Sequence, residues 1–162
     1  MRNSTPPLAA IGLISATALS YEILLTRVFA IVHWHHLVAI AISLALLGYG
    51  VSGTFLTLLG TRLRRRFPAF FVANAILFAI TALVCLSVAQ RIPLDPQALA
   101  WDSRQAVYLA ATFLLLAIPF FAAANCIGAT LSQFRADIPR IYGFDLVGAG
   151  LGAFVPLAAL AL

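Results

Sequence analysis

The sequence predicts an all-α fold, an integral membrane helical bundle of about five transmembrane helices in a single domain that covers residues 1–162. Hydrophobic residues make up 63% of the chain and charged residues only 9%, whereas roughly a quarter of a soluble domain is charged. Five apolar runs approach or exceed the length that a helix needs to cross a bilayer. Prolines and arginines fall between these runs and separate them.

The five predicted spans are approximately 8–32, 37–59, 68–89, 106–126 and 146–162. The first follows Pro6 and Pro7, and as a helix it would be about 37 Å long against a hydrocarbon core of about 30 Å. The second is rich in glycine and ends before a cluster of four arginines.

Further prolines set the limits of the later spans. Pro68 opens the third span, Pro93 and Pro96 follow it, and Pro139 precedes the fifth. Pro119 and Pro156 lie inside spans, where neighbouring helices can satisfy the carbonyl that each proline leaves free. The fifth span ends without a flanking charge, so we expect either a short gene product or a truncated longer protein.

The net charge of +5 comes from arginine alone, since the chain has no lysine. Seven arginines fall at the N-terminus and in the loops between spans two and three and between spans four and five, namely Arg2, Arg62, Arg64, Arg65, Arg66, Arg135 and Arg140. Only Arg91 and Arg104 fall on the other side. Because loops rich in arginine stay in the cytoplasm, we expect a multi-pass protein of a bacterial inner membrane with a cytoplasmic N-terminus. Membrane lipids are the expected partners of this charge, and nucleic acid is not.

Glu22 is the only glutamate, and it lies well inside the first apolar run. An ionisable group at that depth costs about 2.5–3.5 kcal/mol on insertion scales, so it needs a partner, a water cavity or a function. Arg27 lies about 140° further round the helix and cannot pair with it easily. Two interpretations stay open: a carboxylate that titrates or pairs with a substrate, and a neutral carboxyl that hydrogen-bonds between helices.

Three histidines follow the first span, at His33, His35 and His36. Imidazoles in such number can bind a metal or sense pH. On a helix, however, only His33 and His36 would share a face, and no carboxylate or cysteine stands nearby in sequence. We expect polar groups at the membrane interface, with a metal site as the weaker alternative. No cofactor can be identified, although bound lipid is expected.

Glycines in the second and fifth spans predict close helix packing. Gly48, Gly50 and Gly53 match the dinucleotide-binding pattern, but no strand precedes them, so we expect them to admit neighbouring helices instead. Gly148 and Gly152 predict a second close-packing surface.

Polar residues accompany both surfaces. We expect Asp145 to open the fifth helix as a cap at the cytoplasmic edge. Asn74 and Asn125 are expected to form hydrogen bonds between helices.

Three blocks of sequence resemble one family when taken together. They are SATALSYEILLTR at 15–27, AISLALLGYGVSG at 41–53 and IYGFDLVGAGLGA at 141–153. These blocks resemble the N-terminal membrane region of bacterial integral-membrane spermidine synthase-like proteins. The resemblance implies a following cytosolic aminopropyltransferase-like or methyltransferase-like domain that binds an S-adenosylmethionine compound. These 162 residues contain no motif of such a domain, so the family's catalytic residues have no counterparts among them, and the resemblance gives no role to Glu22, Arg27 or Asp145.

The sequence therefore favours a non-catalytic accessory or structural subunit that packs against other transmembrane helices of a larger complex, of respiratory or photosynthetic type. One alternative is the membrane portion of a spermidine synthase-like enzyme whose Rossmann domain is missing. Another is a small transporter or proton-path module centred on Glu22. The chain alone shows no catalytic cluster and is not expected to be an enzyme.

Overall fold

A computed structural model describes residues 5–32, 38–93, 98 and 101–161. The described residues form helices and no strand: α1 (Leu8–Val32), α2 (Val38–Arg64), α3 (Phe67–Ala89), α4 (Ser103–Gln133), the 3₁₀ turn η3 (Arg135–Asp137) and α5 (Ile138–Ala161). Five of these helices are long and apolar enough to cross a membrane. The predictions of an all-α fold and of a multi-pass membrane protein are confirmed at this level.

Several helices extend beyond the apolar runs that predict them. α2 ends at Arg64, α4 covers Ser103–Gln133, and α5 begins at Ile138 rather than near residue 146. Helical hydrogen bonding continues into the polar residues at the ends of a span. A hydropathy pattern does not indicate this part of the helix, because it follows only the apolar residues. Pro139 does not end a segment, because a proline in the first turn of a helix costs no hydrogen bond.

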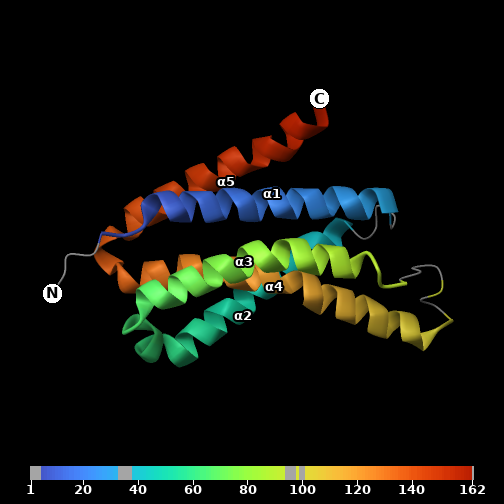
Figure 1. Cartoon of the computed structure of the whole chain (residues 1–162), viewed down its shortest axis with the longest axis horizontal. Helices are drawn as coiled ribbons and strands as arrows, with labels where there is room; N and C mark the ends of the chain where they lie inside the picture. Colours follow the sequence, from blue (N-terminus) through green and yellow to red (C-terminus); the bar gives the residue numbers. More distant parts are fainter. Residues whose placement is uncertain (1–4, 33–37, 94–97, 99–100, 162) are drawn as a thin grey trace.

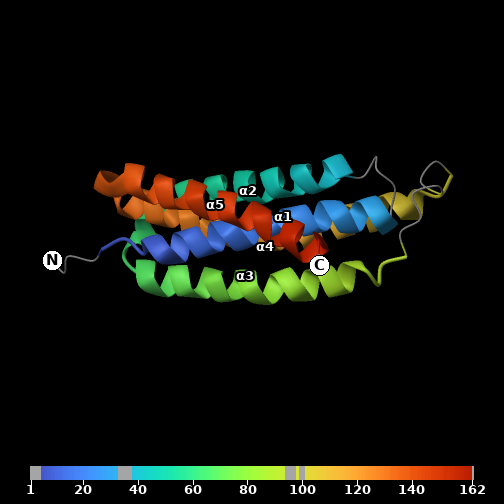
Figure 2. The ribbon, with the colours of Figure 1, turned by 90° about the horizontal axis from the view of Figure 1, so that it is seen from above.

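The five long helices lie side by side with alternating direction (Figures 1 and 2). α1, α3 and α5 run one way, and α2 and α4 run the other. α4 packs against α2 and α3, whereas α5 packs mainly against α1. We call the end where α3 and α5 begin the arginine-rich end; its described and exposed side chains include Arg65, Arg66, Arg135 and Arg140.

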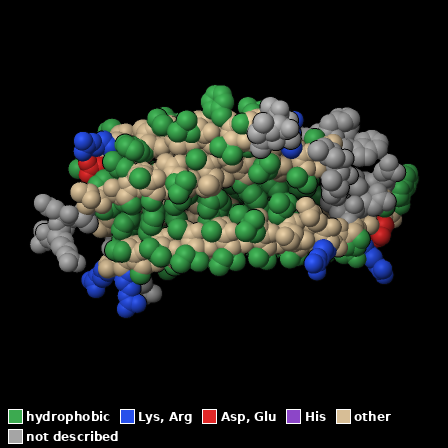
Figure 3. All heavy atoms as spheres, turned by 45° about the horizontal axis from the view of Figure 1, so that its top comes forward, with side chains coloured by type: hydrophobic (Ala, Val, Ile, Leu, Met, Phe, Trp, Pro, Cys, Tyr) green, Lys and Arg blue, Asp and Glu red, His purple; other side chains and the backbone are tan. Residues whose placement is uncertain are grey.

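The face of the bundle seen in Figure 3 carries hydrophobic side chains along its length. Leu13 is 66% exposed, Leu58 78% and Leu83 72%. Charged side chains in this view gather toward the two ends of the molecule. This distribution fits a bundle whose middle lies in hydrocarbon and whose ends reach the interface.

Glycine lets α1 and α5 come into backbone contact. A Cβ atom on Gly148 would lie 2.6 Å from the Gly12 Cα, and one on Gly152 would lie 2.6 Å from the Ala16 Cα. Both pairs are 136 positions apart, so the two helices run parallel and in register. Ser20 adds a hydrogen bond of 2.6 Å from its hydroxyl to the Gly152 carbonyl oxygen.

Gly48 brings α2 equally close to α4. A Cβ atom there would lie 2.6 Å from the Phe120 Cβ and 2.8 Å from the Phe121 backbone nitrogen. Gly53 does not have this role, because no atom lies within 4 Å of the place a Cβ would occupy. It lines a cavity instead. Of the three glycines of the second span that were predicted to admit neighbouring helices, Gly48 lies at a helix contact, whereas Gly50 and Gly53 have open space beside them.

Candidate functional site

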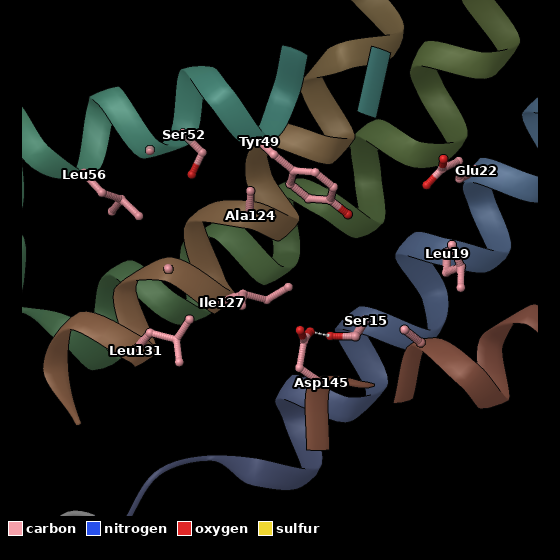
Figure 4. Close-up of a pocket in the computed structure, with 13 residues that line it drawn as sticks. Ser15, Leu19, Glu22, Tyr49, Ser52, Leu56, Ala124, Ile127, Leu131 and Asp145 are labelled. Carbon is pink, nitrogen blue, oxygen red and sulfur yellow. Dashed lines mark hydrogen bonds between the residues drawn. The ribbon is translucent and has the colours of Figure 1, made fainter. Parts of the chain in front are cut away.

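A cavity of about 460 Å³ lies between α1, α2, α4 and α5 (Figure 4). Its lining residues come from all four helices: Ser15, Leu19, Glu22, Tyr49, Ser52, Gly53, Leu56, Ala124, Ile127, Gly128, Leu131, Asp145 and Ala149. Two of them carry carboxyl groups and none is basic. The cavity exists because α5 packs on α1 and hardly on α4. Space is therefore left between the α1–α5 pair and the α2–α4 pair.

Glu22 faces this cavity from the middle of α1. At 1.5 Å per residue it lies about 21 Å from the start of the helix and about 15 Å from its end. Within the described part of the chain its carboxyl makes no hydrogen bond and no ion pair. Arg27 is exposed and does not line the cavity. The structure thus leaves the Glu22 carboxyl facing a cavity and without a cationic neighbour among the lining residues.

Asp145 also faces the cavity, and the prediction that it opens the fifth helix is wrong. α5 begins at Ile138, so Asp145 lies two turns inside it. Its carboxyl accepts a hydrogen bond from the Ser15 hydroxyl of α1. The residue was misplaced because Pro139 looked like a break between segments.

The Ser15 hydroxyl has two acceptors within reach, the Asp145 carboxyl and the Ile11 carbonyl oxygen at 2.9 Å. A hydroxyl carries only one proton, so it can donate to only one of them at a time. The bond to Asp145 links α1 to α5, and the Ile11 carbonyl oxygen is the alternative acceptor within α1.

Tyr49 and Ser52 face the same cavity from α2, with the Tyr49 ring pointing into it (Figure 4). Ser15 and Glu22 are seven residues apart on α1, which is two turns, so both side chains lie on one face about 10 Å apart along the axis. Sequence reasoning had not placed Tyr49 or Ser52 in a site. A polar residue every three or four positions in an apolar run is the signal that could have done so.

Ser52 belongs to a buried chain of hydrogen bonds that crosses three helices. Its hydroxyl donates to the Asn125 side-chain oxygen at 2.7 Å. The Asn125 amide donates to the Asn74 side-chain oxygen at 3.0 Å, and the Asn74 amide donates to the Phe70 carbonyl oxygen at 2.9 Å. These bonds join α2, α4 and α3 behind the cavity wall, as predicted for the two asparagines.

The predicted histidine cluster, His33, His35 and His36, lies outside the described residues. Among the residues that are described, no group of three or more histidine, cysteine or acidic side chains could hold a metal ion.

Comparison with known proteins gives no match: no protein-family model, no curated protein and no solved structure matches this chain. The resemblance to the membrane region of spermidine synthase-like proteins stays a prediction.

Proposed function

We propose that this chain is a small transporter or proton-path module, with Glu22 as its titrating group and the cavity as its site. The observation that carries the proposal is that Glu22 and Asp145 face one cavity that no basic side chain lines among the residues the structure describes. An ionised carboxylate without a counter-ion is costly in a membrane interior. Binding of a proton or of a small cation from the cavity would remove that cost.

The dimensions of the cavity support access by water. Its volume of about 460 Å³ far exceeds the roughly 10–15 Å³ that a single water requires. The Tyr49 hydroxyl and the Glu22 and Asp145 carboxyls offer partners to such water. Toward the arginine-rich end the cavity is lined by Leu56 and Leu131. The proposed entry of the proton is from this end, and we propose that it faces the cytoplasm because arginine-rich loops stay on that side of the membrane.

Glu22→Gln is the direct test. It removes the titrating group but keeps the shape and polarity of the side chain, so a proton-linked flux into liposomes should be abolished. The flux would be followed with a pH-sensitive dye enclosed in the liposomes, under an imposed membrane potential. Helix content and thermal stability in detergent should stay near those of the wild type.

Asp137→Asn is the matched control, because Asp137 lies outside the cavity and only approaches Arg140, at 4.0 Å near the surface. It should leave the flux unchanged, since exposed ion pairs contribute little. If Glu22→Gln conducts as well as the control, or if the wild type moves neither protons nor cations, the proposal is wrong.

A second candidate function is an accessory subunit of a larger membrane complex. The observation that favours it is the outer face of α5, a helix that packs mainly on α1. This face is exposed and apolar, with Val147, Leu151 and Phe154 each more than 60% exposed. Another transmembrane helix could cover it by the same kind of packing that α1 provides on the face of α5 that carries Gly148 and Gly152.

The accessory function predicts that the chain, extracted from its native membrane in a mild detergent, co-migrates with a much larger complex. Size-exclusion chromatography followed by mass spectrometry would identify the neighbours. Elution as a free small protein, in a detergent that preserves other complexes of the same membrane, would contradict it.

A further inference from the structure

A second hollow, separate from the acidic cavity, lies on the outer face of the bundle between α1 and α3. It measures about 630 Å³. The residues that line it are Leu13, Ile14, Ala16, Thr17, Ser20, Tyr21, Leu24, Ala75, Phe78, Ala79, Ala82, Leu83 and Val155. We call it the α1–α3 groove. Figure 3 shows hydrophobic side chains lining a hollow along this face of the molecule.

Small side chains create the groove. Ala75, Ala79 and Ala82 follow each other at helical spacing on α3 and lie on one face of it. α1 packs closely on α5, and α3 on α4, but α1 and α3 do not pack closely against each other. Phe78 and Ile14 are buried and form the floor.

Most polar groups of the groove are already satisfied within the protein. The Thr17 hydroxyl donates to the Leu13 carbonyl oxygen at 2.8 Å, and the Ser20 hydroxyl donates to Gly152 at 2.6 Å. Among the described residues the Tyr21 hydroxyl has no hydrogen-bond partner, but its oxygen is buried and not exposed on the surface of the groove. An occupant therefore needs an apolar surface rather than hydrogen-bonding groups.

The length and position of the groove match one lipid chain. Between Leu13 and Leu24 it follows α1 for roughly 16 Å, which is close to the ~15 Å thickness of one leaflet of the hydrocarbon core. Along α1 it begins at Leu13, about 8 Å from the start of that helix at the arginine-rich end, where Arg65 and Arg66 are exposed immediately before α3. Arginine side chains are visible at this end of the molecule in Figure 3.

We propose that the α1–α3 groove binds one acyl chain of an anionic phospholipid, whose phosphate lies beside Arg65 and Arg66. The apolar groove supplies most of the binding, because an acyl chain fills a space that neither helix closes. The two arginines supply the selectivity for an anionic headgroup. The bound lipid would then act as part of the wall between α1 and α3. The site shares no residue with the acidic cavity, so this proposal does not depend on proton movement.

The test uses the purified full chain and native mass spectrometry, with phosphatidylglycerol and phosphatidylcholine as the competing probes. The wild type should retain phosphatidylglycerol in preference to phosphatidylcholine. Arg65→Gln with Arg66→Gln should lower that preference about thirtyfold. This factor corresponds to the binding free energy that two arginines at the membrane surface usually contribute toward an anionic headgroup. Arg91→Gln with Arg104→Gln, at the opposite end, should leave the preference unchanged.

A second pair of variants tests the groove itself. Ala79→Phe places a ring in the groove and should release both lipids. Ala73→Phe places the same ring on an exposed position of α3 outside the groove, and should retain them. Equal retention by the two phenylalanine variants would overturn the proposed acyl-chain site. An unchanged lipid preference in the Arg65 and Arg66 variant, whose helix packing is not altered, would overturn the proposed headgroup site.

Discussion

Gly148→Ala is expected to loosen α5 from α1 and to lower the free energy of unfolding by about 3 kcal/mol, near the upper end of the cost of overpacking. The added methyl group would lie 2.6 Å from the Gly12 Cα and 2.7 Å from its carbonyl carbon. These are backbone atoms, so no side-chain rotation can relieve the overlap. The two helices must move apart, and the contacts between Gly152 and Ala16 will weaken with them. Unfolding by a denaturing detergent, followed by circular dichroism, would measure the effect.

Gly150→Ala provides a control of opposite sign on the same helix. No atom lies within 4 Å of the position that its Cβ would occupy. Alanine is favoured over glycine in a helix by about 1 kcal/mol, so this variant should be as stable as the wild type or more stable. Equal stability of the Gly148 and Gly150 variants would show that the backbone contact between α1 and α5 is not what holds α5 in place.

Asn125→Leu is expected to destabilise the bundle by about 2–3 kcal/mol, because it removes two interhelical hydrogen bonds and leaves two buried polar groups without partners. The Ser52 hydroxyl would lose its acceptor at 2.7 Å, and the Asn74 oxygen would lose its donor at 3.0 Å. Thr112→Val is a matched control. Thr112 is also buried on α4, but it bonds only to the Tyr108 carbonyl oxygen of its own helix. The control should change stability by much less.

The same hydrogen-bond network also predicts that the stability changes of its single variants do not add. A triple variant, Ser52→Ala with Asn74→Leu and Asn125→Leu, replaces all members of the chain by apolar groups and leaves no orphaned partner. It should be more stable than Asn125→Leu alone, since unpaired buried groups carry much of the cost. If each substitution instead adds its own loss, the three side chains do not act as a connected network.

The helices themselves could be predicted because each carries its own signal. An apolar run of bilayer length is visible without knowledge of any other segment. The ends could not be placed as well, and Pro139 shows why. The same residue ends a helix or opens one, depending on whether the turn around it is the last or the first. Because of that ambiguity, the start of α5 was predicted near residue 146 instead of at Ile138, and Asp145 was wrongly predicted to cap the helix.

Only part of the candidate site could be predicted from the sequence. Glu22 stands out in any reading of the first span, because a lone carboxyl among apolar residues is costly there. Nothing local indicates that Ser15 and Asp145 meet, because 130 positions separate them and the choice of neighbour depends on how five helices pack together. Gly48 and Gly53 make the same point on one helix. Composition marks both as packing residues, but only the arrangement of α2 against α4 determines which one has a neighbour.

The pairing of α1 with α5 has a consequence for the order in which the bundle is made. On the ribosome, at 5–20 residues per second, the residues between the two helices take roughly 5–20 s to synthesise. During that interval the surface of α1 around Gly12 and Ala16 must remain uncovered in the bilayer. Asp145 then enters the membrane beside a hydroxyl that is already in place. Asp145, the residue of α5 that is most costly to place in the membrane, therefore enters it when its hydrogen-bond partner, Ser15 of α1, is already there.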